Sequence, residues 1–259
     1  MKFDLSGRTA IVTGGSSGIG RAAALALAQC GAKVFTGDVQ PRETNAEDFA
    51  AVGIQELTCD VREEAQVRTL IERAVDATGG LHILVSNAGI NMAGQLPDVS
   101  AADWDVCLDI NLKGAFLASK YAIPHLRVAG GGSVIFTSSN AGLLPRAHDP
   151  AYCTSKAGLI ALARSLALCH AGDKIRFNAV CPGPVSNTGL IDDIVQASAD
   201  PKATEWQFIA ASPLAKALGR MITPDEVAAA IVYFASDAAA LVTGTTLRID
   251  GGKSLGVPA

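Results

Sequence analysis

A tyrosine and a lysine in this chain are spaced for proton transfer. Tyr152 and Lys156 lie four residues apart at the start of an apolar, helix-forming segment, and residues at i and i+4 share one face of a helix. A free tyrosine has a pKa of about 10 and is a poor base near neutral pH. A nearby ammonium group stabilises the phenolate and lowers its pKa, which favours general acid–base catalysis. Because this spacing also occurs by chance, it needs support from other motifs.

A glycine-rich turn follows the first β-branched segment, Thr9–Thr13, and leads directly into a helical segment. Glycines allow a pyrophosphate to approach the backbone closely, and the free N–H groups of a helix N-terminus favour negative charge. An ordinary tight turn is the alternative, but the position in the first strand–helix unit favours a dinucleotide site. The predicted cofactor-binding residues of the turn are Gly14, Ser16, Ser17, Gly18 and Ile19.

An acidic residue ends the next predicted strand. Asp38 lies 20 residues after Gly18, close to the expected interval between such a turn and a ribose-binding carboxylate. The carboxylate can accept hydrogen bonds from the adenosine ribose and would repel a 2′-phosphate. Val39 and Gln40 provide no cation, and Arg42 would reach a phosphate only by folding back. The sequence therefore predicts NAD rather than NADP as the cofactor.

Together these motifs resemble the classical short-chain dehydrogenase/reductase family. After the glycine turn come Asn87-Ala88-Gly89, Asn111, Ser139, the Tyr152–Lys156 pair and Pro182-Gly183. Their order and spacing match over essentially the whole chain, so the combination is specific although no single motif is. The resemblance implies hydride transfer between a nicotinamide cofactor and an alcohol or carbonyl compound, without a metal ion.

The resemblance assigns catalytic roles to four residues. Tyr152 is the general acid and base, and Lys156 lowers its pKa and holds the nicotinamide ribose. Ser139, 13 residues before the tyrosine, binds the substrate oxygen, whereas its neighbour Ser138 fits the family spacing less well. Asn111 supports a water-linked proton relay to the lysine. Taken singly, Ser139 could instead simply terminate a strand, and Asn111 could be a structural polar group in a long helix.

The resemblance also places the rest of the cofactor site. Asp60 and Val61 contact the adenine, and Asn87, Ala88 and Gly89 close one side of the adenosine pocket. Many family members have a second asparagine where this chain has Ser86. We interpret this difference as a tolerated change in sheet support.

On the nicotinamide side the resemblance places Pro182, Gly183 and Val185, with the Val185 backbone meeting the carboxamide. The family commonly has threonine two residues after the position of Val185. This chain has Asn187 there, followed by Thr188. Either side chain could serve the carboxamide or the pyrophosphate, so both remain candidates.

The substrate is the least defined part of the prediction. By resemblance, the pocket includes Ser139, Tyr152, Asn91, Asn140, Leu144, His148 and the loop from Ser186 to about Leu218 with Trp206. Its polar side chains, Asn187 among them, favour a sugar or polyol. Three alternatives are a 3-oxoacyl or other carbonyl reductase of the same family, a non-catalytic NAD-sensing scaffold, and an epimerase or dehydratase of an extended related family.

Short apolar segments alternate with longer Ala-rich segments, which predicts βαβ crossovers. The expected fold class is α/β, a Rossmann-type doubly wound parallel sheet with helices on both faces. The predicted strands are Thr9–Thr13, Lys33–Thr36, Gln55–Thr58, Ile83–Ser86, Ser133–Ser138, Arg176–Val180 and Thr246–Ile249. The predicted helices are Ile19–Cys30, Glu63–Thr78, Ala102–Val128, Ala151–His170 and Asp225–Ala235.

No linker, charge block or repeat interrupts this alternation, so residues 1–259 are predicted to form one domain. The segment around 184–221 is rich in turn residues and is expected to be a substrate-binding loop or lid. Thr223 to Glu226 has the pattern of a capping box, and Ser100 to Asp103 is a weaker example. By resemblance, the two longest predicted helices pair with symmetry mates in a homotetramer, and Gly251–Ala259 forms part of a second interface.

Composition excludes several other classes of protein. The 259 residues are 49% hydrophobic and 18% charged, with a formal net charge of −4 and no basic cluster. Nucleic-acid binding is therefore not expected, and no segment has the pattern of a signal peptide or a membrane span. The six cysteines are scattered, which predicts neither disulfides nor a metal site. Cys59 and Cys181 are expected in the core, and the protein is expected to be cytoplasmic.

Overall fold

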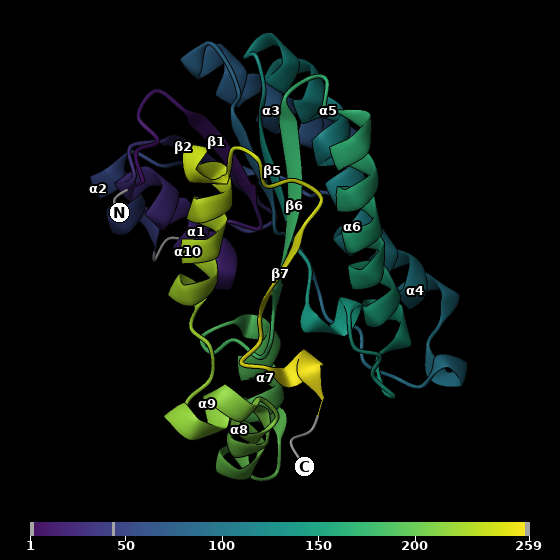
Figure 1. Cartoon of the computed structure of the whole chain (residues 1–259). Helices are drawn as coiled ribbons and strands as arrows, with labels where there is room; N and C mark the ends of the chain where they lie inside the picture. The colour runs from purple at the N-terminus through teal and green to yellow at the C-terminus, as the bar shows by residue number, and fades with distance from the viewer. Residues whose placement is uncertain (1–2, 43–44, 257–259) are drawn as a thin grey trace.

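A parallel sheet runs through the centre of the molecule (Figure 1). The computed structural model describes residues 3–42 and 45–256. All strand pairs are parallel, in the order β3-β2-β1-β4-β5-β6-β7. The strands are β1 (Thr9–Thr13), β2 (Lys33–Asp38), β3 (Gln55–Thr58), β4 (Ile83–Ser86), β5 (Gly132–Thr137), β6 (Ile175–Pro182) and β7 (Thr246–Ile249). The predicted doubly wound α/β fold is confirmed.

Helices cover both faces of this sheet (Figure 1). On one face lie α1 (Gly18–Gln29) and α10 (Pro224–Ala235), and on the other lie α3 (Glu64–Thr78), α5 (Gly114–Val128) and α6 (Pro150–Cys169). Successive side chains of a strand point to opposite faces: Val12 packs in the core under α1 and α10, whereas Ile11 packs in the core under α3, α5 and α6. The central strands are buried on both faces, which explains why β1 and β4 are largely apolar, whereas the edge strands β3 and β7 are partly exposed and carry polar residues.

The topology creates a crevice at the centre of the sheet. The chain crosses from β3, at one edge, back to β4, which pairs with β1 on the side opposite β2. The loops that follow β1 and β4 therefore leave the sheet toward helices on opposite faces. In open α/β sheets, ligands bind in the crevice beyond the carboxyl ends of the strands at such a reversal. The glycine turn and Asn87-Ala88-Gly89 both lie at this point.

The long helix predicted from Ala102 to Val128 is not continuous. It consists of α4 (Ala101–Leu108), a π-helical turn (Asp109–Lys113) and α5. Asn111 lies in the turn, where its buried amide is bonded to the backbone of Ile90 in the loop after β4. Such turns inside helices commonly accompany functional positions. The residue pattern on either side remains helical, so periodicity alone does not reveal the interruption.

The sequence prediction also missed four short helices. One is α2 (Ala46–Val52), and the other three, α7 (Gly189–Ala197), α8 (Pro201–Ala210) and α9 (Pro213–Leu218), lie in the predicted lid segment. Prolines begin α8 and α9, a position that proline favours. The cap predicted at Ser100 is present, because its hydroxyl accepts a hydrogen bond from Asp103 N at 3.0 Å.

Other predictions about the chain can be compared with the structure. Cys59 and Cys181 lie in the core as predicted. No helix in the described ranges is sufficiently long and apolar to span a membrane. Of the predicted C-terminal interface segment, residues 257–259 lie outside the described residues.

Candidate active site

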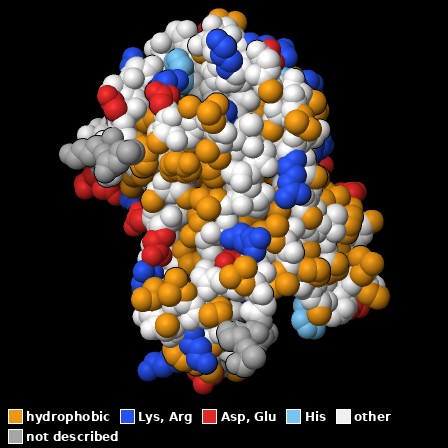
Figure 2. Space-filling view, viewed as in Figure 1, with side chains coloured by type: hydrophobic (Ala, Val, Ile, Leu, Met, Phe, Trp, Pro, Cys, Tyr) orange, Lys and Arg blue, Asp and Glu red, His pale blue; other side chains and the backbone are white. Residues whose placement is uncertain are grey.

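A cavity of about 790 Å³ lies beyond the carboxyl ends of the strands. Its wall includes the glycine turn, the ends of β2 and β4, the start of α6 and the inner side of α7. The surface is hollowed between the part of the molecule that carries α7, α8 and α9 and the part that carries α4 (Figure 2). The candidate catalytic and cofactor-binding residues line this wall or lie directly behind it.

Tyr152 and Lys156 line the cavity from the first two turns of α6. The helix begins at Pro150, and both side chains are buried. Lys156 Nζ donates a hydrogen bond to Thr137 O at 3.0 Å and lies 5.7 Å from the centroid of the Tyr152 ring. The structure therefore brings the predicted pair together at the cavity wall.

The two serines after β5 have different partners. Ser138 Oγ donates a hydrogen bond of 2.7 Å to Lys156 O and so links the strand end to α6. Ser139 Oγ donates to Asn140 Oδ1 at 3.3 Å and accepts from Ala141 N at 3.1 Å, and its interaction with the Tyr152 side chain opposes the rise in the pKa of that phenol. Both serines line the cavity, but the hydroxyl of Ser138 is bonded to the backbone of α6, whereas that of Ser139 is not.

Asn111 lies behind the cavity wall rather than on it. Its side-chain oxygen accepts from Ile90 N at 2.8 Å, and its amide nitrogen donates to Ile90 O at 3.0 Å and to Ser155 Oγ at 3.0 Å. A Cβ at Gly89 would lie 3.0 Å from both Asn111 Oδ1 and Lys156 Nζ. Asn111 thus holds the loop after β4 in place. Its Oδ1 and the Nζ of Lys156 both lie close to Gly89.

The glycine turn is packed tightly against the loop that follows β4. Gly14 and Gly18 have positive φ angles of 65° and 52°. A Cβ at Gly14 would lie 2.8 Å from Ala88 Cα, and one at Gly20 would lie 2.0 Å from Gly14 O. Asn87 Nδ2 donates to Gly14 O at 3.0 Å. Larger residues would therefore force the two loops apart.

Asp38 lines the cavity at the end of β2, as predicted. Its Oδ2 accepts a hydrogen bond from Ser16 N at 3.1 Å. The side chain of Ser16, predicted to bind cofactor, is buried behind the turn and donates to Glu56 Oε1. Ser16 therefore orients the carboxylate of Asp38 through its backbone N–H and does not form part of the cavity wall, because its hydroxyl points to Glu56 of β3.

Asp60 and Val61 also line the cavity beside Asp38. Arg62 Nε lies 3.0 Å from each carboxylate oxygen of Asp60, and Nη2 lies 2.6 Å from Oδ2. This pairing lowers the pKa of Asp60. The charge of Arg62, at this end of the cavity, is thus already neutralised by the carboxylate of Asp60.

The structure distinguishes the two candidates on the nicotinamide side. Thr188 lines the cavity with Pro182, Gly183 and Val185, and its Cγ2 would lie 3.1 Å from a Cβ at Gly18. Asn187 is exposed and has a positive φ of 54°. This left-handed conformation turns the chain so that Thr188, and not Asn187, faces the glycine turn.

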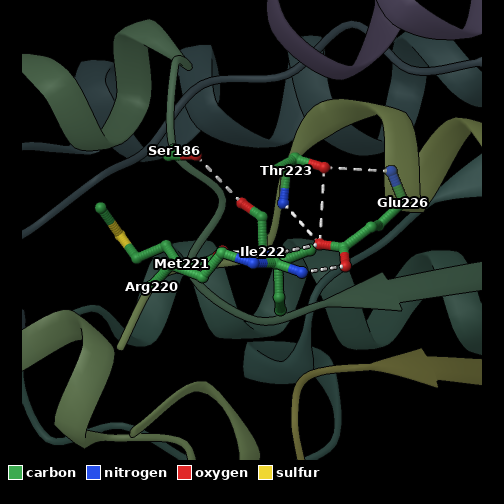
Figure 3. Close-up of polar contacts among 6 residues, drawn as sticks. All are labelled: Ser186, Arg220, Met221, Ile222, Thr223 and Glu226. Atoms are coloured by element: carbon green, nitrogen blue, oxygen red, sulfur yellow. Dashed lines mark hydrogen bonds and ion pairs between the residues drawn. The ribbon is translucent and has the colours of Figure 1, made fainter. Parts of the chain in front are cut away.

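The two ends of the predicted lid segment are fastened to each other (Figure 3). Ser186 N and Oγ both donate to Ile222 O, at 2.9 and 3.2 Å. Thr223 and Glu226 form the predicted capping box of α10, and Glu226 also pairs with Arg220 at 2.8 Å. The helices α7 to α9 therefore extend from a closed, hydrogen-bonded base.

Comparisons with known proteins assign the family. A family model described as enoyl-(acyl carrier protein) reductase matches residues 14–254. The cis-4-hydroxycyclohexanecarboxylate dehydrogenase of Sinomonas cyclohexanicum is 39% identical, with 95% of this chain and 96% of the relative covered. A 3-oxoacyl-[acyl-carrier-protein] reductase of Thermotoga maritima is 34% identical, with 96% and 98% covered. The structure of Thermoplasma acidophilum aldohexose dehydrogenase superimposes with a TM-score of 0.90 at 32% identity, covering 99% and 98% of the two chains.

The chain is a classical short-chain dehydrogenase/reductase. It is thus an oxidoreductase of alcohols or carbonyl compounds, and its family works with nicotinamide cofactors. The sequence resemblance is confirmed over nearly the full length.

Burial dominates the electrostatics of the Tyr152–Lys156 pair in this dehydrogenase/reductase. Burial raises the pKa of Tyr152, while the hydrogen bond from Ser139 and the charge of Arg146 oppose that rise. Burial also lowers the pKa of Lys156 to about 8. The sequence argument predicted a lowered tyrosine pKa. In this structure the desolvation of the phenol outweighs the effect of its cationic neighbours.

The predicted substrate residues of the dehydrogenase/reductase are only partly assembled. Asn91 and His148 line the cavity, and the buried Asn91 Oδ1 has no hydrogen-bond partner within residues 3–42 and 45–256. Asn140 is fully buried and accepts from Arg146, while Trp206 is half exposed. Asn140, Leu144, Asn187 and Trp206 are absent from the cavity wall. Fewer polar side chains therefore line the cavity than the sequence analysis expected for a sugar-binding site.

Sequence reasoning missed several residues of this wall. Arg146 and Lys253 supply positive charge, and Leu190, Ile191, Ile194 and Phe208 supply apolar surface. Arg146 precedes Tyr152 by six residues, so its charge near the motif was a usable signal. Lys253 follows the last strand and reaches the site only through the fold. The apolar residues belong to α7 and α8, within the segment from Ser186 to about Leu218 that the sequence analysis places at the pocket.

Proposed function

We propose that the protein is an NAD(H)-dependent oxidoreductase that interconverts a secondary alcohol and the corresponding ketone. The observation that carries this proposal is that Tyr152, Lys156 and Ser139 line the same cavity as the glycine turn and Asp38. Two of the named relatives are dehydrogenases and one is a reductase, which supports alcohol–carbonyl interconversion.

The residues around the crevice fit a dinucleotide. The glycine turn leaves backbone N–H groups free at the N-terminus of α1, where a pyrophosphate is favoured. A side chain at Gly14 would close the cradle against Ala88. Asp38, Asp60 and Val61 would hold the adenosine, and Pro182, Gly183, Val185 and Thr188 would hold the nicotinamide end.

Two features support NAD over NADP. Asp38 puts a carboxylate at the ribose position, where a 2′-phosphate would be repelled. The nearby cations Arg21 and Arg62 are occupied by Asp48 and Asp60, so neither is free to neutralise that phosphate.

Bound NAD supplies the acceptor for a hydride from the alcohol carbon, and NADH supplies the donor in the reverse direction. In oxidation, Tyr152 Oη takes the hydroxyl proton while the carbon–hydrogen bond breaks and the carbonyl forms. Ser139 Oγ holds the substrate oxygen in position for this transfer. Lys156 stabilises the phenolate by its charge, and Asn111 keeps the loop beside the ammonium in place. In reduction, Tyr152 returns the proton to the new hydroxyl.

A cofactor-reduction screen tests this function. Purified protein with NAD⁺ would be assayed for NADH formation over sugars, polyols, hydroxy acids and steroid alcohols. We expect turnover of at least one alcohol, and faster turnover with NAD⁺ than with NADP⁺. NAD binding without turnover of any alcohol or ketone would favour a sensing scaffold instead.

A further inference from the structure

Two cationic side chains lie on the substrate side of the cavity. Arg146 belongs to the loop before α6, and Lys253 belongs to the turn after β7. Both line the cavity together with Tyr152, and the charge of Arg146 contributes to lowering the pKa of Lys253. They come from distant parts of the sequence and converge on one wall.

Arg146 is held in a fixed orientation. Its Nη1 donates to Asp149 Oδ2 at 3.0 Å and its Nη2 donates to Asn140 Oδ1 at 2.7 Å. Its Cζ lies 5.9 Å from the centroid of the Tyr152 ring. A guanidinium has more N–H donors than these two bonds use, so Arg146 can still bind a ligand close to the reacting phenol.

Lys253 lacks a comparable partner. Its ammonium makes no hydrogen bond or ion pair among the residues that the structure describes. The adjacent carboxylate of Asp250 is nearly buried and accepts from Gly252 N and Ser254 N, each at 2.9 Å. Burial is the main cause that lowers the pKa of Lys253. A partly desolvated cation of this kind is stabilised by an anion in the cavity.

The part of the cavity wall contributed by α7 and α8 is largely apolar, whereas Asn91, His148 and Asp149 are its polar neighbours. Leu190, Ile191 and Ile194 of α7 and Phe208 of α8 line it. A wall of this kind suits the hydrocarbon body of a ligand, whereas Arg146 and Lys253 suit a charged end. A neutral polyol would give the ammonium of Lys253 no anionic partner and would place its hydroxyl groups against α7.

We infer that the natural substrate is an amphipathic hydroxy or oxo acid. Its anionic oxygen group binds Arg146 and Lys253, its hydrocarbon body contacts α7 and α8, and its alcohol or carbonyl oxygen lies at Tyr152 and Ser139. The inference rests on the proposed function and assigns the substrate class for the same site. Carboxylates and sulfonates share the required anionic chemistry.

Kinetics with matched substrates test this inference. 5-Hydroxyhexanoate and 3-hydroxycyclohexanecarboxylate would be compared with their methyl esters and with 3-hydroxycyclohexanesulfonate, using kcat/KM with NAD⁺. We expect an anion to be preferred over its ester by at least about tenfold. The carboxylate and sulfonate arms identify which anion the site prefers. Equal or better turnover of the esters would overturn the inference and leave the proposed function intact.

Variants then assign the preference to the two cations. Arg146→Gln and Lys253→Met should each reduce the acid-to-ester ratio of kcat/KM by about tenfold, mainly by raising KM for the acid. Lys253→Arg should restore the ratio. Lys216→Met removes an exposed charge of α9 that is not on the cavity wall, and it should keep the ratio of the unmodified protein. An unchanged ratio in both Arg146→Gln and Lys253→Met would refute the assignment.

Direct binding separates this inference from a failure of the proposed function. If no alcohol is oxidised, calorimetry of the protein with cyclohexanecarboxylate and with cyclohexanecarboxamide still tests anion binding. Tighter binding of the carboxylate, lost in Lys253→Met, would support the anion site even though the proposed chemistry had failed. Equal binding of the two compounds would overturn it.

Discussion

Ser138 and Ser139 are adjacent buried serines whose hydroxyl groups have different partners, and they permit a matched test of the site. Ser138 Oγ donates to Lys156 O at 2.7 Å. Ser138→Ala removes this buried bond, at a net cost of about 1 kcal/mol in the free energy of unfolding. For a chain of this length the melting temperature should fall by about 2–4 °C. The reacting groups should be little affected.

Ser139→Ala should have a similar effect on stability and a much larger effect on turnover. Its hydroxyl accepts from Ala141 N at 3.1 Å and donates to Asn140 Oδ1 at 3.3 Å, so buried hydrogen bonds are again lost. The same hydroxyl faces Tyr152 and is proposed to hold the substrate oxygen. Loss of one such donor reduces kcat by about 10²–10³, or roughly 2.7–4 kcal/mol in the activation barrier.

Steady-state NADH formation and thermal unfolding would be measured for both variants, with the best alcohol from the screen. The ratio of kcat between Ser138→Ala and Ser139→Ala should reach about 10² or more, while the two melting temperatures stay close. If Ser138→Ala were as inactive as Ser139→Ala, or if Ser139→Ala kept normal turnover, the assignment of the two hydroxyls would be refuted.

Three further predictions concern the cofactor, pH and assembly. NAD(H) should be preferred over NADP(H) by at least about tenfold, roughly 1.4 kcal/mol, and Asp38→Ala should narrow this difference in kcat/KM; equal use of both cofactors would contradict it. Burial raises the pKa of Tyr152, and alcohol oxidation needs its phenolate form, so kcat for oxidation should rise with pH. The kcat for carbonyl reduction, which needs the protonated phenol, should fall with pH. Oxidation and reduction rates that change with pH in the same direction would contradict this mechanism. Sedimentation should detect a homotetramer, since Leu108, Leu112, Phe116 and Leu162 form an apolar hollow over α4, α5 and α6; a stable monomer at micromolar concentration would exclude it.

The sheet was the most predictable part of the fold. Its central strands are buried on both faces, so short apolar segments bounded by turns identify them, and all seven strands lie within two residues of the predicted limits at both ends. The largest differences are at the carboxyl ends of β2 and β6, which extend two residues further where they pair with β3 and β7. The interruption at Asn111 was not predictable, because it results from bonds to Ile90, a residue distant in sequence.

Some residues of the candidate site could be predicted from the sequence, and others could not. Tyr152, Lys156, Ser139 and Asp38 were identifiable because each lies within a local motif of fixed spacing. Whether a side chain faces the cavity depends on backbone direction, so the burial of Ser16 and the exposure of Asn187 required the structure. Arg146 and Lys253 are 107 residues apart in the sequence and line the same cavity only in the folded chain, so no local pattern predicts their common location.

The central claim is that Tyr152 transfers the proton, and Tyr152→Phe tests it most directly. The substitution keeps the buried ring and removes only the hydroxyl group. NAD binding, measured by calorimetry, should be retained, while kcat for the best alcohol falls by about 10²–10⁴. Lys156→Ala should weaken both turnover and NAD binding, and the double variant should lose less than the sum of the two effects. Near-normal turnover by Tyr152→Phe, with NAD binding unchanged, would contradict the mechanism.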